Sequence, residues 1–487
     1  MSLNISRLSL LQQTVSGVKW NVASQLGQQV TQIFTLVVLA RLLSPTEFGL
    51  LGMATVFTGL VSLFKDLGTC AAVIQSRNAT SGLLCSVFWT NLTLGVGSTV
   101  VVASTAPLVA AYYREPRITA VLRFLSIGFV ISGCSVLQKA IFERNLAFRI
   151  TAWSETAGVV GGAVVGIASA LMGAGIWALV AQALVSASVT SALLWAFSDW
   201  RPTLTFEWAE IKRVSGFSLG LTGFNFVNYF ARNADYLLIG RFLGANQLGI
   251  YTLAYRVMLY PLQSVTAVVS RVTFPVCTQF QDDDARFRSA YLRTAAMIGL
   301  VTFPIVLGVY SVARPLVLTI FGSKWTSAIP LIAILTPIGL IQSITSTVGI
   351  IYQAKGRGKT FFAWGIGSSS LIVTGFVVGL HWGVQGVAGA YAVVMLIITI
   401  PCFAIPFRFI GLKLKSFTAV LVRPLASSML MMAVIFASRI GLLHLGQSAH
   451  LWVLIPAGVV SYIACSWIVN RNQLRQFAAL LGENSEL

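Results

Sequence analysis

The chain has 487 residues, of which 56% are hydrophobic and only 10% are charged, and its formal net charge is +19. Soluble globular proteins, disordered chains and coiled coils have much lower apolar contents, so the composition excludes all three classes. A membrane-spanning helix needs about 20 predominantly apolar residues, and this chain has enough for on the order of a dozen of them or more.

Apolar runs separated by charged or Pro/Gly-containing loops predict about fourteen membrane-spanning helices. Their centres lie near residues 28, 58, 95, 127, 161, 186, 227, 259, 302, 340, 370, 395, 430 and 460. The longest loop, from about Ser198 to Lys212, is too short for an extramembrane catalytic domain. The N-terminal residues lack the continuous apolar stretch and the cleavage site of a removable signal peptide.

The basic residues predict the orientation of the chain in the membrane. Twenty of the 33 Lys and Arg residues fall at helix ends and loops of one parity, and six lie within helices. The opposite parity holds seven: Arg41, Arg114, Arg117, Arg241, Arg314, Lys324 and Arg439. Since cytoplasmic loops are enriched in Lys and Arg, both termini are predicted to be cytoplasmic. The net charge then needs no nucleic-acid partner and fits contact with anionic lipids of the inner leaflet.

An internal repeat predicts the domain organisation. Residues 41–50 (RLLSPTEFGL) reappear as 241–250 (RFLGANQLGI), and weaker matches follow at an offset of 211 residues. Two parallel six-helix repeats around a central cavity account for these offsets. The predicted fold is therefore an all-α polytopic membrane protein with an N-terminal lobe (1–210), a C-terminal lobe (211–412) and two extra helices with a short cytoplasmic tail (413–487).

Three charged residues lie deep in the predicted membrane region. They are Arg232 and Asp235 on helix 7 and Arg256 on helix 8. A charge at the middle of the bilayer costs at least ~2.5 to 3.5 kcal/mol, so it needs a partner or a hydrated cavity. Two arginines at one level favour an anionic ligand. The alternative is an Arg232–Asp235 ion pair and interhelical hydrogen bonds that hold the halves together.

Polar side chains form one face on each of two repeat-equivalent helices, which is typical of the wall of a hydrated cavity. The predicted cavity residues are Gln25, Gln28, Gln29 and Gln32 on helix 1 and Asn225, Asn228, Arg232 and Asp235 on helix 7. Tyr229 and Tyr255 on helices 7 and 8 are candidates for stacking on sugar, although tyrosine is also common near membrane interfaces.

Lys65 and Asp66 on helix 2 are predicted near the cytoplasmic mouth, either as an inner gate or as an interfacial pair. Asp66 and Asp235 are also the candidates for a coupled ion, H⁺ or Na⁺. Glu155 lies near a helix end and is expected to have a structural role. Glycines spaced four apart, at 158, 162 and 166 and at 375, 379 and 383, predict close helix packing. Scattered single cysteines indicate neither a metal site nor a disulfide framework, and no cofactor is expected.

Several strings together resemble a known family. They are LARLLSPTEFGLLGMATVFTGLVSLFKDLG at 39–68, YTLAYRV at 251–257, TFPVCTQFQDDDARFR at 273–288 and FGSKWTSAIP at 321–330. With them the chain resembles the polysaccharide exporters of the multidrug/oligosaccharidyl-lipid/polysaccharide superfamily, in particular the colanic-acid exporter subgroup. The resemblance implies a bacterial inner-membrane flippase, not an enzyme, that moves an undecaprenyl-pyrophosphate-linked oligosaccharide during exopolysaccharide or lipopolysaccharide biosynthesis.

The family also implies which residues bind the substrate. Basic residues on helices 1, 2, 7 and 8 are thought to hold the pyrophosphate, and Arg232, Arg256 and Lys65 occupy such helices here. Helix 1 departs from this pattern because its polar face is glutamine. A polysaccharide polymerase or co-polymerase is an implied partner. The alternatives are a cation-coupled drug antiporter of the same superfamily, with Asp235 holding the cation, and a membrane-embedded glycan polymerase or glycosyltransferase.

Overall fold

The structure is a computed structural model that describes the backbone of residues 24–63, 70, 73–74, 80–208, 212, 228–441 and 447–470. Side chains are described for these residues except 260–261, 263–276, 278, 441 and 447–449. The chain divides into two compact units, Met1–Gly249 (unit 1) and Ile250–Leu487 (unit 2). Throughout the described residues the regular structure is helical, which confirms the predicted all-α class.

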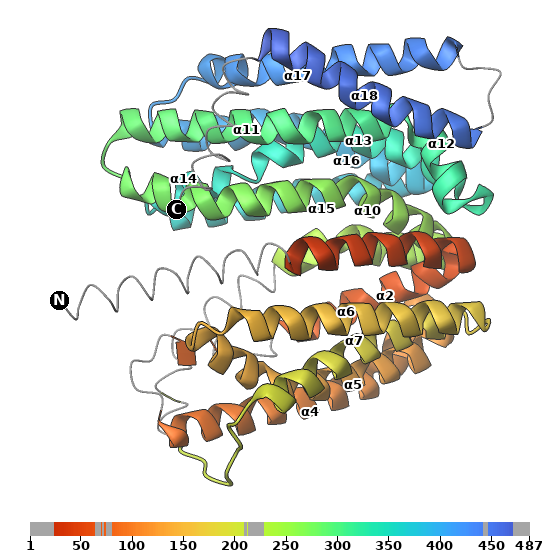
Figure 1. The fold of residues 1–487 in the computed structure, drawn as a ribbon, viewed down its shortest axis with the longest axis vertical. Coiled ribbons are helices and arrows are strands. Elements are labelled where there is room, and N and C mark those ends of the chain that lie inside the picture. Colours follow the sequence, from red (N-terminus) through yellow and green to blue (C-terminus); the bar gives the residue numbers. More distant parts are fainter. Residues whose placement is uncertain are drawn as a thin grey trace. The chain divides into compact units, whose positions relative to one another are not determined.

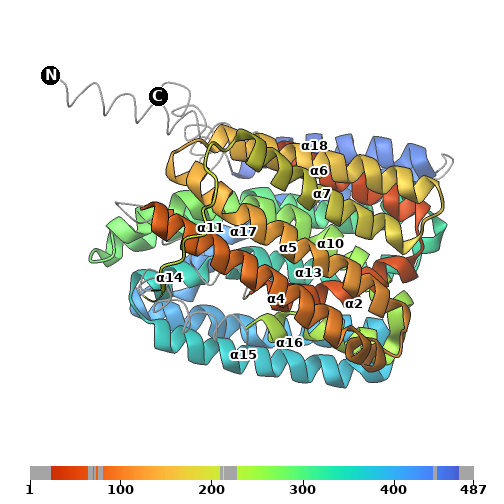
Figure 2. The ribbon, with the colours of Figure 1, turned by 90° about the horizontal axis from the view of Figure 1, so that it is seen from below.

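Unit 1 consists of long helices joined by short turns. They are a helix over residues 24–42, α2 (Pro45–Ser62), α4 (Ser81–Tyr113), α5 (Arg117–Arg144), α6 (Phe148–Leu171), α7 (Ile176–Phe197), a helical turn over 228–232 and the first part of α10 (Ala234–Gln279). In Figures 1 and 2, α4, α5, α7 and α6 run side by side, and the contacts follow the same order. The backbone of α10 is interrupted at Gly244, whose φ of 84° favours glycine, so α10 comprises two helices in succession.

The start of α2 shows how the sequence defines a helix end. Ser44 precedes the helix and Pro45 begins it, where the proline's missing N–H costs no hydrogen bond. The Glu47 carboxylate accepts hydrogen bonds from the Ser44 backbone N–H (2.5 Å) and the Ser44 hydroxyl (2.9 Å). These contacts satisfy a backbone donor that the helix leaves unpaired, so the turn before α2 has a defined geometry.

The glycines spaced four apart on α6 allow its backbone to pack directly on α7. A Cβ at Gly158 would lie 2.0 Å from Oγ1 of Thr190, and one at Gly162 would lie 2.6 Å from the backbone oxygen of Gln182. A Cβ at Gly166 would also be too close to Gln182, at 2.8 Å from its Cβ. Close helix packing is thus confirmed as the role of this stripe.

Unit 2 begins within α10, at Ile250. It contains α11 (Asp284–Ser311), α12 (Ala313–Leu316), η1 (Val317–Phe321), η2 (Ser323–Trp325), α13 (Ala328–Thr345), α14 (Val348–Ala354), α15 (Gly358–Gly379), η3 (Leu380–Trp382), α16 (Gly383–Phe409), α17 (Leu414–Gly441) and α18 (Gln447–Val469). A buried aromatic cluster of Tyr291, Phe403, Phe407 and Phe417 joins α11, α16 and α17. At one end of this unit, the Lys355 ammonium forms an ion pair with Asp284 at 2.7 Å.

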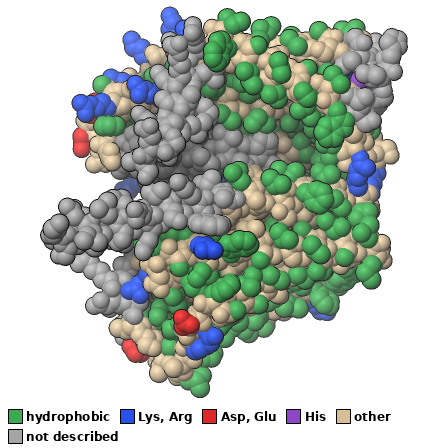
Figure 3. All heavy atoms as spheres, viewed as in Figure 1, with side chains coloured by type: hydrophobic (Ala, Val, Ile, Leu, Met, Phe, Trp, Pro, Cys, Tyr) green, Lys and Arg blue, Asp and Glu red, His purple; other side chains and the backbone are tan. Residues whose placement is uncertain are grey.

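The described helices agree with the predicted spans. Thirteen of the fourteen predicted centres fall within helices, and the other, residue 227, lies outside the described residues. Within the described residues, nine helical segments are long and apolar enough to cross a membrane. Hydrophobic side chains cover much of the face in Figure 3. The chain is therefore a multi-pass membrane protein.

Candidate functional site

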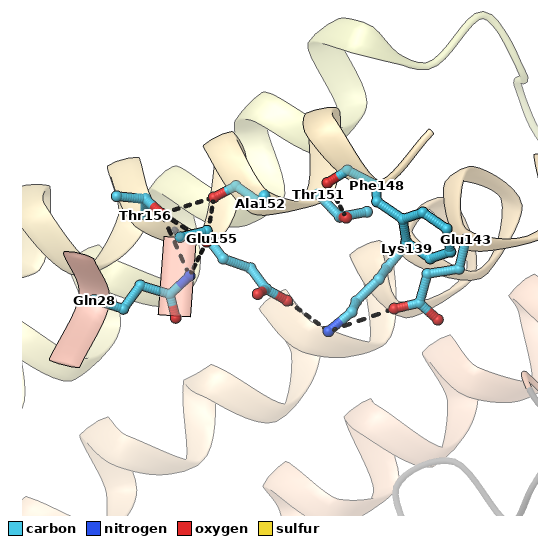
Figure 4. A network of polar contacts seen from close by, with 9 residues as sticks. Gln28, Lys139, Glu143, Phe148, Thr151, Ala152, Glu155 and Thr156 are labelled. Atoms are coloured by element: carbon cyan, nitrogen blue, oxygen red, sulfur yellow. Dashed lines mark hydrogen bonds and ion pairs between the residues drawn. The ribbon is translucent and has the colours of Figure 1, made fainter. Parts of the chain in front are cut away.

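The glutamine face of helix 24–42 packs partly against α6. The Gln28 amide nitrogen donates to the Ser24 hydroxyl at 2.9 Å and to the Thr156 hydroxyl at 3.4 Å (Figure 4). Ser24 also lies 3.1 Å from Thr156 and donates to the Ala152 carbonyl at 3.3 Å. Gln28 thus contributes to an interhelical hydrogen-bond network, as in the alternative interpretation of this face.

The other three glutamines of this face differ in exposure. Gln25 and Gln32 are exposed on the same helix, whereas Gln29 is half-buried. The role predicted for Gln25, Gln29 and Gln32 in contact with substrate stays a prediction.

A charged cluster lies beside this network on the α5–α6 hairpin. The Lys139 ammonium contacts the Glu155 carboxylate at 2.5 Å and the Glu143 carboxylate at 3.9 Å (Figure 4). All three side chains are partly exposed, at 44% for Lys139, 35% for Glu155 and 34% for Glu143. Lys139 lies five residues before the end of α5, and Glu155 lies seven residues after the start of α6. The hairpin therefore brings them within about half a helical turn of one level, and this spacing could have revealed the pair.

On the seventh predicted helix, the two charged candidates have opposite environments. Arg232 is exposed, whereas Asp235 is only 3% exposed. The Asp235 carboxylate accepts a hydrogen bond from the Tyr236 backbone N–H at 2.9 Å. Asn228 is half-buried on the turn before Arg232. An exposed arginine and a buried carboxylate three residues apart provide separate candidates for anion binding and for ion coupling.

Tyr229 contacts α2 rather than an open surface. Its hydroxyl donates to the Val56 carbonyl at 2.8 Å and lies 3.3 Å from the Thr55 carbonyl. A Cβ at Gly59 would lie 2.1 Å from the same hydroxyl, so this glycine provides the space for the tyrosine. In this structure the Tyr229 hydroxyl is used for helix contact, and its predicted stacking on sugar stays a prediction.

The predicted residues of helix 8 belong to unit 2. Arg256 is half-buried, and Tyr255 is half-buried with its ring stacked on that of Tyr251 at 5.7 Å between centroids. Tyr251 is fully buried. Three further predicted residues, Asn225, Lys65 and Asp66, lie outside the described residues.

The first part of α10 is held against α2 and α4 at one end of unit 1. The Arg241 guanidinium donates to the Tyr112 carbonyl at 2.6 Å and lies 5.6 Å from the centre of its ring. Beside it, the buried Tyr113 ring fits against Gly240, where a Cβ would lie 2.6 Å away. Arg241 and the nearby Arg117 both belong to the basic set predicted on the outer side of the membrane. The neighbouring Glu115 forms an ion pair with Arg117 at 2.8 Å.

At the same end, the two copies of the repeated sequence touch each other. A Cβ at Gly49 would lie 1.7 Å from the Ala245 backbone oxygen, and a Cβ at Gly249 would lie 1.7 Å from the Pro45 backbone oxygen. The Asn246 amide donates to the Thr46 hydroxyl at 3.3 Å. The sequence repeat identified Gly49 and Gly249 as equivalent residues. Equivalence alone did not predict that the two segments that contain them are in contact.

Comparison with known proteins places the chain among proteins of polysaccharide synthesis. Residues 38–330, more than half of the chain, match the profile of a family described as polysaccharide biosynthesis protein. The teichuronic acid biosynthesis protein TuaB of Bacillus subtilis is 28% identical over 93% of this chain and 95% of its own length. The lipopolysaccharide biosynthesis protein WzxC of Escherichia coli is 29% identical over 81% of this chain and 80% of its own. The succinoglycan biosynthesis transport protein ExoT of Rhizobium meliloti is 29% identical over 72% and 71%.

Solved structures share the fold at low identity. The lipid II flippase MurJ, in an inward closed conformation, has a TM-score of 0.74 and 14% identity, covering 94% of this chain and 100% of that one. An inward-facing multidrug resistance transporter of the MATE family in the MOP superfamily has a TM-score of 0.65 and 18% identity, covering 79% and 94%. These likenesses confirm the all-helical membrane-protein fold, and the family match together with the curated relatives confirms the resemblance drawn from the sequence motifs.

Proposed function

Because the chain belongs to the family of polysaccharide biosynthesis proteins, we propose that it flips an undecaprenyl-pyrophosphate-linked oligosaccharide across the bacterial inner membrane by alternating access. It is a transporter rather than an enzyme. The names of the succinoglycan transport protein ExoT and the lipid II flippase MurJ support a lipid-linked glycan as the substrate class.

The observation that carries this proposal is the exposed side chain of Arg232. Arg241, nine residues further on, lies at a helix end beside Tyr112. Nine helical residues span ~13 Å, so Arg232 lies near the middle of a hydrocarbon layer of about 30 Å. An exposed guanidinium at that depth is costly in lipid, and it is favourable where water or an anion reaches it. We propose that this anion is the pyrophosphate, with Arg256 as a second ligand.

The remaining predicted residues fit the rest of such a substrate. Pyrophosphate and sugar hydroxyls both lose strong hydration on entering hydrocarbon, so each needs polar contacts along the route. Gln25 and Gln32 offer amides to the sugar, and Tyr255 offers an aromatic face. The polyprenyl tail needs no such contact, because it can stay in lipid throughout the movement.

The orientation and the partners follow from the charge distribution and the substrate. We propose that both termini are cytoplasmic, since most basic residues occupy one side, and that these residues contact anionic lipids of the inner leaflet. A polysaccharide polymerase or co-polymerase would consume the product on the outer side. We propose Asp235 as the group that carries a coupled H⁺ or Na⁺, since it is a buried carboxylate on the helix that presents Arg232.

Charge reversal tests the anion ligands. Arg232→Glu and Arg256→Glu are each expected to reduce export of the cognate polysaccharide at least tenfold, because a charge-assisted hydrogen bond contributes about 1.5 to 3 kcal/mol. The control is Arg123→Glu, since Arg123 is an exposed arginine near the outer end of α5 and should leave export unchanged. All variants are compared at equal amounts in the membrane.

Export is measured as cell-surface polysaccharide and as translocation of a fluorescent lipid-linked oligosaccharide in proteoliposomes. Normal export by both charge-reversed variants would show that Arg232 and Arg256 do not bind the substrate. Resistance to cationic drugs, without any oligosaccharide translocation, would instead establish the antiporter alternative.

A further inference from the structure

Residues 203–208, which follow α7, form a strap across the beginning of α4. Near one end of the strap, the Trp89 indole N–H donates a hydrogen bond to the Thr203 carbonyl at 2.9 Å. Near the other end, the Glu207 backbone N–H donates to the Ser86 hydroxyl at 2.8 Å. The strap is therefore fixed to α4 at two points, four residues apart along its length.

The strap covers the beginning of a helix face that is open further along α4. The α4 residues in contact with the strap are spaced three or four apart on one helix face, and they are Gly82, Cys85, Ser86 and Trp89. The same spacing continues through Thr93, Val96 and Val100, which are exposed. A Cβ at the neighbouring Gly97 would have no atom within 4 Å. An open, largely apolar face of a membrane-spanning helix contacts lipid, so the strap lies on the lipid side of α4.

The outward side of the strap is an apolar ridge of three side chains. Leu204 is 90% exposed, Phe206 is 50% exposed and Trp208 is 68% exposed. They alternate with residues that make polar contacts, such as Thr203 and Thr205, whose hydroxyls lie 2.9 Å apart. Alternate residues of an extended segment point to opposite sides, so the polar side of the strap faces α4 and the ridge faces away from it. The rings of Phe206 and Trp208 lie 6.2 Å apart between centroids.

The length of α4 gives the depth of the strap in the bilayer. The helix has 33 residues and is about 50 Å long, whereas the hydrocarbon layer is about 30 Å thick. When α4 is centred on the bilayer, about 10 Å of it extends into the headgroup layer at each end. The strap contacts residues 82–89, within the first three turns, and therefore lies at the boundary between headgroups and hydrocarbon. In Figure 1 the segment after α7 passes this end of α4 on the side away from α6.

We propose that the ridge of Leu204, Phe206 and Trp208 inserts into this boundary and anchors the strap to the membrane surface. Tryptophan is enriched at the boundary, and phenylalanine and leucine accompany it in interfacial anchors. The partner is the phospholipid bilayer itself, on the side that the basic residues assign to the cytoplasm. Glu207 is the charged residue of the strap, so the contact is apolar and needs no anionic lipid. This contact goes beyond the proposed function, because it involves no transported substrate.

Photo-cross-linking identifies what the ridge touches. The photoreactive residue p-benzoylphenylalanine replaces Leu204, Phe206 or, as a control, Asp282, which is exposed on the loop before α11. Each purified protein is irradiated in vesicles of phosphatidylcholine, with or without phosphatidylglycerol, and its mass is measured. We expect adducts of one phospholipid at positions 204 and 206, background adducts at 282, and the same yield with both lipid compositions. Irradiation in intact cells shows whether another protein occupies the ridge instead, because a protein adduct migrates at a much higher mass.

Limited proteolysis tests whether the ridge holds the strap in the membrane. A glutamate-specific protease is applied to open membrane fragments, and cleavage after Glu207 is followed for the wild type and for Leu204→Ser, Phe206→Ser and Trp208→Ser combined. Each rate is divided by the rate for a free peptide of the same strap sequence, which removes the preference of the protease. The combined variant should be cut about tenfold faster or more, because burial of even one such side chain shifts an equilibrium by about that factor. Thr205→Ser, on the polar side of the strap, is the matched control and should be cut at the wild-type rate.

Several results would overturn the anchor. They are lipid adducts at 204 and 206 no more frequent than at 282, protein adducts that dominate in cells, and equal normalised cleavage of the combined variant and the wild type. Adducts that form only with phosphatidylglycerol would contradict the apolar contact. None of these measurements needs a transport substrate, so the anchor and the proposed function are tested separately.

Discussion

Replacing Lys139 by methionine is expected to destabilise unit 1 more than replacing Glu155 by glutamine, although the two residues form one ion pair. The reason is the second carboxylate. Lys139 lies within 3.9 Å of both Glu143 and Glu155, so its removal leaves two carboxylates facing a site without a cation. Removal of Glu155 leaves the ammonium with Glu143 as its partner.

The magnitude follows from distance and exposure. Two unit charges about 4 Å apart interact by roughly 4 kcal/mol at an effective dielectric constant near 20. Both side chains of the pair are more than one third exposed, which reduces the contribution to about 1 to 2 kcal/mol. We therefore expect Glu155→Gln to cost about 1 kcal/mol, and Lys139→Met about 2 to 3 kcal/mol because like-charge repulsion is added.

The assay is thermal unfolding of the purified protein in detergent, followed by tryptophan fluorescence, for both single variants and the double variant. The double-mutant cycle isolates the coupling between the two side chains. Arg286→Met serves as the control, because its ion pair with Asp283 is more exposed, at 72% and 46%, and should contribute at most about 0.5 kcal/mol. A Glu155→Gln variant at least as unstable as Lys139→Met would refute the reasoning.

Three further outcomes can be measured. Gly162→Ala should lower the unfolding temperature, since overpacking against α7 costs about 1 to 3 kcal/mol, while Gly97→Ala should not; equal temperatures would contradict the close packing. The Arg117 guanidinium holds the pKa of Glu115 below its usual range. The ion pair therefore stabilises the folded protein at pH values above the ordinary carboxyl pKa, and this stabilisation is lost as the pH falls through the lowered pKa of Glu115. The difference in unfolding temperature between the wild type and Glu115→Gln should decrease on acidification. A difference that does not change with pH would exclude stabilisation by this ion pair. Trp89→Phe removes a 2.9 Å hydrogen bond to the loop after α7 and should speed its proteolysis; an unchanged rate would show that the bond does not restrain the loop.

The sequence was sufficient for the helices because length and hydropathy determine which segments can cross a bilayer. It was also sufficient for the packing role of Gly158, Gly162 and Gly166, since small residues four apart share one helix face. Both inferences depend only on the periodicity of a single helix, which the sequence displays directly.

The contacts between helices could not be predicted in the same way. The sequence made Tyr229 a candidate for stacking on sugar, but the partner of its hydroxyl is a backbone carbonyl of α2, which no side-chain pattern reveals. The same holds for Gly49 and Gly249, whose partners are also backbone oxygens. Lys139 and Glu155 could have been paired from their positions on the hairpin, because they lie five residues before the end of α5 and seven residues after the start of α6.

The direct backbone contact between α6 and α7 has a mechanical consequence. Long side chains between two helices can change rotamer and let the helices slide, whereas a glycine stripe against backbone oxygens, the Thr190 hydroxyl and the Cβ of Gln182 leaves little to rearrange. We therefore expect α6 and α7 to behave as one stiff lever. A conformational change within unit 1 would then occur at contacts that are made through side chains. A small tilt at one end of the α6–α7 pair would move the other end by the same angle.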